Sequence, residues 1–543
     1  MTFDPCNVLM IYPRFNPKSF WGFEGARELL GTHYPTTPLG MITVAAMLPK
    51  CWNVRLVNRN IQELCQDDLA WADLVMSGGM LPQQSDTLKI IELAHAAGKP
   101  VVVGGPDVTS SPQLYAAADI RVRGEAEGVL DEFIEAWRRG MRSGDFIAPK
   151  FQADVARSPV PRFDLLNFKD YMFVGVQFSR GCPFTCEFCD IIELYGRVPR
   201  TKTPEQMLAE LDRLYALGYR GHLDFVDDNL IGNKKAVKAF LPHLIGWQKK
   251  HDFPYMLSTE ASLNLSDDAE LLQMMKDANF FVVFIGIESP DPETLRHTQK
   301  KQNTRRSIPD SVHRIHHYGI SVIAGFIIGF DTDKPGADDA MVNCIEEAAI
   351  PIAMVSLLYA LPNTQLTRRL AKEGRLHEDN GVDVSGGVGE ACLAGLNFET
   401  LRPRQEVLKQ QVIVLARIYD PKAYFGRVRR MVLSLNKLKL GPWIGLRESL
   451  REIDHFFKIM WHVTLHRPEM RRHVWALLLE TLVRNPRAIR DVIVSTVFYI
   501  YLGPLSAFVV ERFSKEITDL EAADAQRPRV LPPNLDEVTV RAA

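Results

Sequence analysis

The sequence predicts an α/β protein in three parts: a doubly wound, Rossmann-like N-terminal domain, a partial (β/α)6 barrel and a helical C-terminal region. Short runs rich in Val, Ile and Leu alternate with helical stretches over most of the chain, which is typical of buried parallel sheets covered by helices. Beyond about residue 375 these runs fade and basic, helical sequence follows. We therefore expect the third part to be helical.

The N-terminal domain is expected over residues 1–145, followed by a linker over 146–170 that contains the Pro- and charge-containing segment 148–164. The candidate strands of this domain are NVLMIYP, NVRLVN, ADLVMSGG and KPVVVGGP. Residues 84–98 are expected to form an amphipathic helix between two of these strands. The pattern indicates a doubly wound sheet with helices on both faces.

The partial barrel is expected over residues 171–375. Its six candidate strands are MFVGVQFSRG, HLDFVDDNL, YMLSTEASL, FVVFIGIES, ISVIAGFIIGF and IAMVSLLYALP. A helical C-terminal domain is expected over 376–518. The polar, Pro-rich tail over 519–543 is expected to be disordered.

Composition excludes several classes of protein. The chain is 46% hydrophobic and 24% charged, with a net charge of −2, so it is an ordinary globular protein without the basic surface that nucleic acids require. The first residues, MTFDPCNVLMIYPRF, lack the basic and small-residue features of a secretory signal, so a cytoplasmic location without disulfides is expected.

Three cysteines lie close together in the segment RGCPFTCEFCD: Cys182, Cys186 and Cys189. A structural zinc site normally takes four ligands, and the nearest downstream imidazole, His222, lies far along the chain. Three cysteines at this spacing can bind three irons of a [4Fe–4S] cluster and leave the fourth iron open to a ligand. Chance cysteines or an incomplete zinc site are the alternative. No chemistry is assigned to the scattered cysteines, which are Cys6, Cys51, Cys65, Cys344 and Cys392.

Over about residues 170–375 the chain resembles the radical S-adenosylmethionine (SAM) enzymes. Their signature is Cys-x3-Cys-x2-Cys after the first barrel strand, and Phe188 stands at the aromatic position before the third cysteine. The resemblance implies that the open iron chelates the amino and carboxylate groups of SAM, which is then cleaved to a 5′-deoxyadenosyl radical. It also implies an electron donor such as flavodoxin or ferredoxin.

The same resemblance implies SAM contacts at the ends of the barrel strands, where β/α folds build their sites. Asp227 or Asp228 is expected to accept from the SAM ammonium, with solvated loop carboxylates as the alternative. Glu260 and Glu288 are expected near the ribose or the amino acid, unless they are helix caps or ion-pair partners. The glycines assigned to SAM binding are Gly286, Gly325 and Gly329, of which the last two lie along the adenine or only mark a bulge.

Two further barrel features have weaker assignments. Tyr359 is a candidate for lining the cavity at the sixth strand. The segment over 290–303, PDPETLRHTQKKQN, is interpreted as a solvated loop, with a cover over the active site or an anion-binding segment as the alternative.

The N-terminal domain resembles the cobalamin-binding domain that precedes some radical SAM barrels, although plain turn chemistry explains each of its loops taken singly. The resemblance implies that Pro38, Leu39 and Gly40 pack on the corrin. It also implies strand-end loops around the nucleotide tail, formed by Ser77, Gly78, Gly104, Gly105 and Pro106, with Gly124, Glu125 and Glu127 close by. The Asp-x-His-x-x-Gly motif is absent from the sequence, so cobalamin is expected to bind without a protein imidazole on the cobalt.

The two cofactors together imply C-methylation at an unactivated carbon, with methylcobalamin as the methyl source. Radical ring closure or oxidation without methyl transfer is the alternative, and a non-enzymatic cobalamin sensor is a third reading that the intact cysteine motif disfavours. The layout resembles the hopanoid C-2 and C-3 methylases and related lipid-modifying proteins, which implies a hydrophobic, lipid substrate.

The C-terminal region carries two signs of membrane contact. Residues 422–490 are basic and contain Trp443, Phe456, Phe457, Trp461 and Trp475, a combination typical of interfacial helices. Residues 492–510 carry no charge and are long enough for a transmembrane candidate, but Gly503 and Pro504 interrupt them. We expect peripheral contact with the inner face of a membrane rather than a span. The alternative for residues 492–510 is a buried helical hairpin that closes the barrel mouth.

Overall fold

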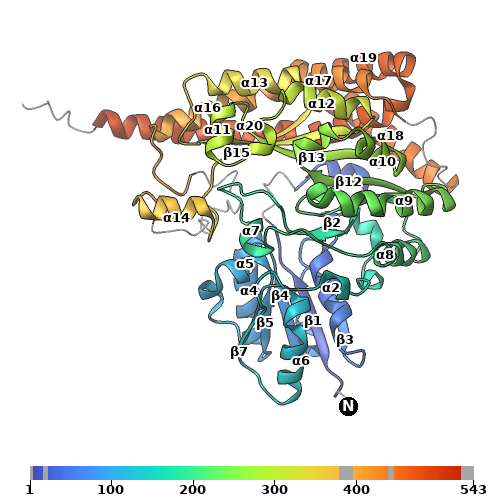
Figure 1. Cartoon of the computed structure of the whole chain (residues 1–543), viewed down its shortest axis with the longest axis vertical. Coiled ribbons are helices and arrows are strands. Elements are labelled where there is room, and N and C mark those ends of the chain that lie inside the picture. Colours follow the sequence, from blue (N-terminus) through green and yellow to red (C-terminus); the bar gives the residue numbers. More distant parts are fainter. Residues whose placement is uncertain (1–3, 16–21, 378–395, 438–445, 527–543) are drawn as a thin grey trace, which may run out of the picture.

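The computed structural model describes residues 4–15, 22–377, 396–437 and 446–526. Two parallel sheets follow one another along the chain, and a layer of helices covers the second at the end of the molecule opposite the N terminus (Figure 1). This arrangement confirms the predicted α/β fold class with a helical C-terminal region. Cys392 and Trp443 lie outside the described residues.

The N-terminal sheet has six strands in the order β3-β1-β4-β5-β6-β7, and every neighbouring pair is parallel. Along β1, Val8 and Met10 belong to one buried cluster and Leu9 and Ile11 to another, so both faces of the sheet are covered. The strands are β1 (Asn7–Tyr12), β3 (Asn53–Asn58), β4 (Leu74–Gly78), β5 (Val101–Gly104), β6 (Ile120–Arg123) and β7 (Gly144–Ile147). The helices are α2 (Leu39–Met47), α3 (Gln66–Trp71), α4 (Gln84–Ala96), α5 (Pro106–Ser110) and α6 (Leu130–Arg138).

The second sheet has the order β15-β14-β13-β12-β11-β8-β2, and its first six strands are the six predicted for the partial barrel. They are β8 (Tyr171–Val176), β11 (Gly221–Phe225), β12 (Tyr255–Ala261), β13 (Phe280–Glu288), β14 (Ser321–Ile328) and β15 (Ile352–Leu357). Their connecting helices are α8 (Pro204–Ala216), α9 (Lys234–Lys250), α10 (Ala269–Asp277), α11 (Pro292–His297), α12 (Ile308–His317) and α13 (Ala337–Glu347). A short antiparallel pair, β9 (Ser179–Arg180) with β10 (Arg200–Thr201), and α7 (Ile191–Leu194) frame the cysteine segment.

The seventh strand of the barrel sheet comes from the N-terminal part of the chain. Strand β2 (Tyr34–Thr36) pairs in parallel with β8, and helix α1 (Ala26–Leu30) precedes it. The sequence gives no signal for β2, because three residues are too few to show a period. A segment of the N-terminal part of the chain is therefore hydrogen-bonded into the barrel sheet.

The C-terminal helices cover the open edge of the barrel sheet. On α16 (Arg404–Ile418), the Gln411 side chain donates to the Val355 carbonyl at 2.7 Å, and Tyr419, just beyond this helix, donates its hydroxyl to the Ala353 carbonyl at 2.9 Å. These bonds satisfy edge groups of β15 that would otherwise remain unpaired. The remaining helices are α14 (Gln365–Lys372), α17 (Pro421–Ser434), α18 (Leu446–His466), α19 (Pro468–Arg484) and α20 (Ile489–Gln526).

Helix α20 contains the uncharged segment of residues 492–510 as one continuous helix that passes through Gly503 and Pro504. The predicted alternative of a helical hairpin is therefore wrong. By length and composition the stretch Pro486–Ala523 could cross a membrane, yet 61% of its apolar window is buried inside the protein, as in the core helix of a soluble protein. The helix continues to Gln526, past the start of the tail expected from residue 519, and residues 527–543 lie outside the described part.

Candidate active site

The cysteine segment follows β9 in a series of tight turns. The amide of Cys182 donates to the Gly196 carbonyl, and the amide of Cys189 donates to the Cys186 carbonyl, each at 3.2 Å. None of the cysteines that the structure describes forms a disulfide. Burial raises the pKa of the Cys182 and Cys189 thiols, that of Cys189 strongly, so iron has to displace their protons when it binds.

The surroundings of the cysteines suit an iron–sulfur cluster. Within the described ranges no group of three His, Cys, Asp or Glu side chains is close enough to hold one metal ion. A four-iron cluster binds each cysteine to a different iron and so needs them further apart. Amide donors approach two of the sulfurs: Asn229 Nδ2 lies 3.7 Å from Cys182 Sγ, and Gln302 Nε2 lies 3.8 Å from Cys186 Sγ. Such donors stabilise cluster thiolates.

The two predicted strand-end aspartates hold the loop that leads to the cysteines. Asp227 is buried and accepts from the amide of Phe178 at 3.0 Å and from the amide and hydroxyl of Ser179. Asp228 accepts from the amide of Gly181 at 2.7 Å. Burial raises the pKa of Asp227 to about 7 and that of Asp228 to about 6. The alternative of solvated loop carboxylates is therefore wrong. Asp228 accepts fewer hydrogen bonds than Asp227 and so has more capacity left for a ligand.

Glu260 at the end of β12 has the property expected of a ligand-binding carboxylate. Its Oε2 atom is buried and has no hydrogen-bond partner within the described structure. Burial, together with the nearby Asp224, raises the pKa of Glu260 well above its usual range. A buried acceptor of this kind fits the ammonium or ribose hydroxyls of SAM, which would supply the missing donor.

The segment 290–303 folds back towards the cysteines instead of forming a solvated loop, so that interpretation is wrong. Lys300 pairs with Glu288 at 2.7 Å, and the Asn303 side chain donates to the Gly286 carbonyl at 2.9 Å. A Cβ on Gly286 would lie 2.3 Å from Glu288 Oε1 and 2.8 Å from Lys300 Nζ, which explains the glycine. Glu288 is thus an ion-pair partner in a left-handed backbone conformation, with φ of 69°. The sequence signal was the short spacing of Lys300, Gln302 and Asn303 after a strand-end glutamate.

The remaining barrel residues line the same region with packing roles of their own. Gly325 on β14 leaves room for the Phe284 ring, whose Cζ would lie 3.1 Å from an added Cβ. Gly329 has φ of 106°, which favours glycine. The rings of Phe188 and Phe330 lie 5.9 Å apart, and Tyr359 is buried beyond the end of β15. Contact of either glycine with adenine stays a prediction.

Sequence reasoning missed a polar group inside the barrel. On β11, His222 and Asp224 point to the same face, and both contact Ser258 of β12, with His222 Nε2 at 2.6 Å from its hydroxyl. Burial lowers the pKa of His222 to about 3 and raises that of Asp224 to about 6. The sequence signal that could have found this group is the spacing of His222 and Asp224, because residues two apart on a strand face the same side.

The glycine-rich loops of the N-terminal sheet lie at the strand ends that face the barrel (Figure 1). A Cβ on Gly78 would lie 1.9 Å from the Gly104 carbonyl oxygen, so the loops after β4 and β5 meet backbone to backbone. Ser77 donates its hydroxyl to the Ile11 carbonyl at 2.9 Å, and Gly105, with φ of 100°, begins α5 at Pro106. The loops therefore expose backbone without side chains, a surface that fits the predicted cobalamin tail.

The start of α2 carries the residues predicted to pack on the corrin. Pro38 precedes the helix, and Leu39 packs towards Gly175 of β8, 3.8 Å from where its Cβ would lie. A Cβ on Gly40 would meet no atom within 4 Å. Gly40 is exposed, so the first turn of α2 has free space on that side, and packing of these residues on a corrin stays a prediction.

Glu125 and Glu127 connect the loop after β6 to the short β9–β10 pair that precedes and follows the cysteine segment. Glu127 pairs with Arg180 at 2.7 Å, and Glu125 pairs with Arg200 at 2.7 Å and with Arg180 at 3.3 Å. Burial alone would raise the pKa of Glu127, but Arg180 outweighs it and lowers the pKa to about 2. Gly124, with φ of 86°, directs this loop away from β6. The loop predicted near cobalamin therefore forms ion pairs with Arg180, which lies two residues before Cys182.

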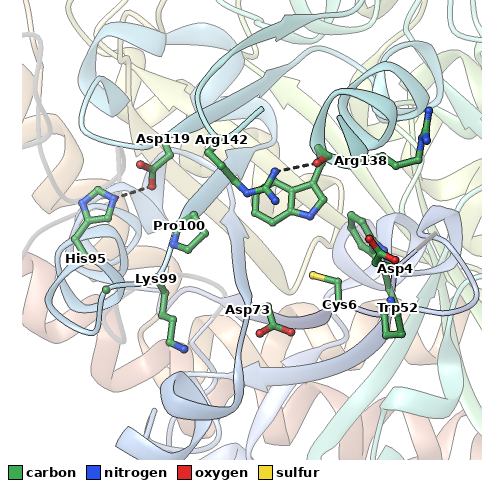
Figure 2. A pocket seen from close by; sticks show the side chains of 13 residues that line it. Asp4, Cys6, Trp52, Asp73, His95, Lys99, Pro100, Asp119, Arg138 and Arg142 are labelled. Atoms are coloured by element: carbon green, nitrogen blue, oxygen red, sulfur yellow. Dashed lines mark hydrogen bonds and ion pairs between the residues drawn. The ribbon is translucent and has the colours of Figure 1, made fainter. Parts of the chain in front are cut away.

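A pocket of about 870 Å³ lies at the amino ends of the strands of the N-terminal sheet, opposite the glycine-rich loops (Figure 2). Its lining includes Cys6 and Asp73, which precede β1 and β4. Its charged groups are largely paired: His95 lies 2.8 Å from Asp119, and the Arg142 guanidinium stacks 3.9 Å above the Trp137 ring. None of the predicted site residues lies in it.

Comparison with known proteins gives three family matches. The B12 binding domain matches residues 31–134, the Radical SAM superfamily matches 176–341, and a domain of unknown function, DUF4070, matches 364–514. In chain order they fall on most of the N-terminal sheet, most of the barrel sheet and most of the C-terminal helices.

Similar proteins extend over most of the chain. An uncharacterized methyltransferase of Synechocystis is 43% identical over 88% of both chains. The hopanoid C-2 methylase of Rhodopseudomonas palustris is 36% identical over 88% of this chain and 90% of its own. Among solved structures, the cobalamin-dependent radical enzyme OxsB with aqua-cobalamin bound is 14% identical and matches with a TM-score of 0.60 over 96% of this chain and 82% of its own. The last likeness concerns the fold alone.

Proposed function

This chain belongs to the cobalamin-dependent radical SAM methyltransferases, and we propose that it methylates an unactivated carbon of a hopanoid-type lipid. The family membership confirms three predicted cofactors: a [4Fe–4S] cluster, SAM and cobalamin. It also confirms that the protein is a C-methyltransferase. This result disfavours the two alternatives, which were ring closure without methyl transfer and a non-enzymatic sensor. The lipid substrate is the part that we propose.

We assign the cofactor contacts to the residues whose surroundings fit them. Cys182, Cys186 and Cys189 would hold the cluster, Asp228 and Glu260 the SAM, and the glycine loops after β4 and β5 the cobalamin tail. When bound, these groups supply a 5′-deoxyadenosyl radical and a transferable methyl group.

The chain itself holds the cofactor-binding loops in fixed positions. Asp227 and Asp228 fix the backbone between Phe178 and Gly181, so the cysteine loop is ordered by buried hydrogen bonds. Glu127 fixes Arg180 from the N-terminal side. A loop held in this way keeps the cysteines and the glycine loops in one relative position, which a reaction between two cofactors needs.

The observation that carries the lipid proposal is the lining of the barrel. Along β14 the outward residues are fully buried, while the inward residues Ile323, Gly325 and Ile327 remain partly exposed. On the neighbouring strand β13, Phe281 and Phe284 are also partly exposed. An apolar stretch of the lining on β13 and β14 that the protein's own side chains do not fully cover suits a hydrophobic skeleton, while the polar groups lie on β11 and β12. The resemblance to a hopanoid C-2 methylase supports the same substrate class.

We also propose that the protein contacts a membrane peripherally, because a lipid substrate resides there. The predicted interfacial residues Phe456, Phe457, Trp461 and Trp475 belong to α18 and α19. An electron donor such as flavodoxin or ferredoxin would complete the system.

The function is tested with the protein reconstituted anaerobically with iron, sulfide and cobalamin. With SAM, a reductant and a detergent-solubilised hopanoid, we expect a product heavier by one methylene. We also expect 5′-deoxyadenosine and S-adenosylhomocysteine in similar amounts. Cys189→Ala should form neither the product nor 5′-deoxyadenosine. If 5′-deoxyadenosine forms without a methylated hopanoid, across a panel of such lipids, the substrate proposal is wrong.

A further inference from the structure

Two neighbouring helices, α18 and α19, carry an unusual amount of exposed apolar surface. Of the 16 large apolar side chains that are exposed in the described part of the chain, 8 lie on these two helices. Single exposed apolar residues are normal, but a contiguous group marks an interaction site. The group, which we name the α18–α19 face, consists of Ile453, Phe457, Trp461, Leu465, Trp475, Leu479, Leu482 and Val483.

The spacing places these residues in one stripe on each helix. On α18 they recur at every fourth residue, and on α19 Trp475, Leu479 and Val483 do the same. Residues four apart lie on one side of a helix. The two helices pack together, and the Trp475 indole donates to Thr464 Oγ1 at 3.0 Å, which joins the two stripes. The result is a continuous face.

The opposite sides of both helices are already used by the protein core. Ile459, Met460 and Val463 of α18 and Val474 and Leu477 of α19 are buried in the main hydrophobic cluster. Both helices are thus apolar on two sides. Packing within the chain accounts for one side only, while Phe457 remains 65%, Trp461 67% and Val483 83% exposed.

The surroundings of the face are basic. Arg471 and Arg472 are exposed at the start of α19, next to Trp475, and make no ion pair within the described residues. At the other end of α19, next to Val483, Arg484 is exposed and pairs with Glu480 at 2.8 Å, and Arg487 just beyond the helix is exposed. Tryptophans and aliphatic residues bordered by arginine are the composition of helices that lie in the surface of an anionic bilayer. A second copy of the chain would bring like charges together instead.

We propose that the α18–α19 face inserts into the surface of an anionic lipid leaflet and is the membrane-docking site of this protein. The segment with the strongest transmembrane character, in α20, is largely buried and does not take this role. Figure 1 places α19 at the end of the molecule opposite the N terminus, where it can meet a flat surface. The inference rests on the proposed lipid substrate for its purpose, and the face itself is argued from exposure and charge.

The test is co-sedimentation of the full-length reconstituted protein with vesicles. We expect binding to vesicles containing phosphatidylglycerol, weaker binding to phosphatidylcholine alone, and a decrease with added salt. In the double variant Trp461→Glu/Leu479→Glu, the partition coefficient should fall about tenfold. The matched control is Met141→Glu/Leu401→Glu, which replaces exposed apolar residues away from the face and should bind like the unmodified protein.

A second double variant, Phe457→Gln/Val483→Gln, covers the case in which the first does not fold, and the rate of SAM cleavage in detergent checks that each variant is active. Equal binding of the face and control variants, or no binding of the unmodified protein, would overturn the proposal. So would a dimer in sedimentation equilibrium that the face variants abolish. Methylation of detergent-solubilised hopanoid without vesicle binding would overturn the docking site alone, whereas vesicle binding without methylation would overturn the substrate alone.

Discussion

At the level of single residues, the barrel interior is marked by carboxyl groups that burial keeps from ionising easily. Asp224, Asp227, Asp228 and Glu260 belong to β11, β12 and the loop after β11, and the pKa of each is raised. So many desolvated acids in one place are costly unless ligands or protons compensate them. This is the physical signature of a binding site.

Asp224 gives a prediction on pH. Its folded pKa of about 6 lies above its ordinary value of 3.8, so the folded state binds its proton more tightly than the unfolded chain. Stability from this group is therefore present below about pH 4 and is lost as pH rises through 6. Asn at this position does not ionise, so the variant Asp224→Asn does not lose this stability as pH rises. The unfolding free energy of the variant minus that of the unmodified protein should therefore increase by up to about 3 kcal/mol between pH 4 and pH 7.

This prediction is measured by denaturant unfolding at a series of pH values. Asp519→Asn, at an exposed position on α20, is the matched control and should show no such trend. A difference between Asp224→Asn and the unmodified protein that stays constant with pH would contradict the assignment of Asp224 as a desolvated acid.

Gly78 gives a second prediction at this scale. Its added Cβ would overlap the Gly104 carbonyl, so Gly78→Ala should separate the loops after β4 and β5. We expect a loss of about 3 kcal/mol or more in unfolding free energy and a lower cobalamin content after reconstitution. Gly98→Ala is the control, because its φ of 68° is also positive but no atom lies within 4 Å, and it should cost about 1 kcal/mol. Equal losses in both variants would exclude the backbone contact as the cause.

At the level of elements, the loop after β6 and the strand before Cys182 form a buried ion-pair clamp between the N-terminal domain and the cysteine segment. Glu127→Gln removes the charge that faces Arg180. We expect a loss of about 2–3 kcal/mol in unfolding free energy. We also expect a severalfold rise in 5′-deoxyadenosine formed per methylated product, because the cluster loop and the glycine loops would no longer keep one position.

The matched control for this variant is Glu135→Gln on α6, whose carboxylate pairs with Arg138 and Arg139 at the surface. Surface pairs contribute little to stability, so both readouts should stay near those of the unmodified protein. A stability loss in Glu127→Gln with an unchanged product ratio would limit the clamp to a purely structural role.

At the level of the whole molecule, an N-terminal segment and the last helix are both packed on the barrel sheet. Strand β2 adds to the barrel sheet, and Phe23 stacks against Tyr501 of α20 with ring centroids 5.6 Å apart and contacts Phe498 at 5.2 Å. The N-terminal segment, the barrel and the last helix therefore share one buried cluster. We expect them to unfold together.

Calorimetry of the protein tests this expectation, with a single cooperative transition as the predicted result. Phe23→Ala should destabilise by about 3–5 kcal/mol and broaden or split that transition. Phe151→Ala, which removes an exposed phenylalanine, should leave one transition in place. Two separated transitions in the unmodified protein would mean that β2 and Phe23 do not couple the N-terminal part of the chain to the barrel.

Much of the fold was predictable because its strands are buried on both faces. The apolar runs of β1, β4 and β5, and the six barrel strands, each carry a local signal that is strong enough to read. Strand β2 is too short for such a signal, and its partner β8 lies far along the chain. The same limit applies to segment 290–303, whose charged composition indicates a loop while Lys300 is buried only because Glu288 stands opposite it.

By itself, the sequence determined the α/β class and the three cluster-binding cysteines, because strand periodicity and the Cys-x3-Cys-x2-Cys spacing are local properties of the chain. Only the tertiary structure decided which side chains are free for ligands: Glu127 faces Arg180, Asp227 holds backbone amides, and Glu260 keeps a buried oxygen unpaired. It also decided which apolar helices are covered, since α20 is largely buried while α18 and α19 are exposed on one side. Composition cannot settle such questions, because exposure depends on what packs against a residue from distant parts of the chain.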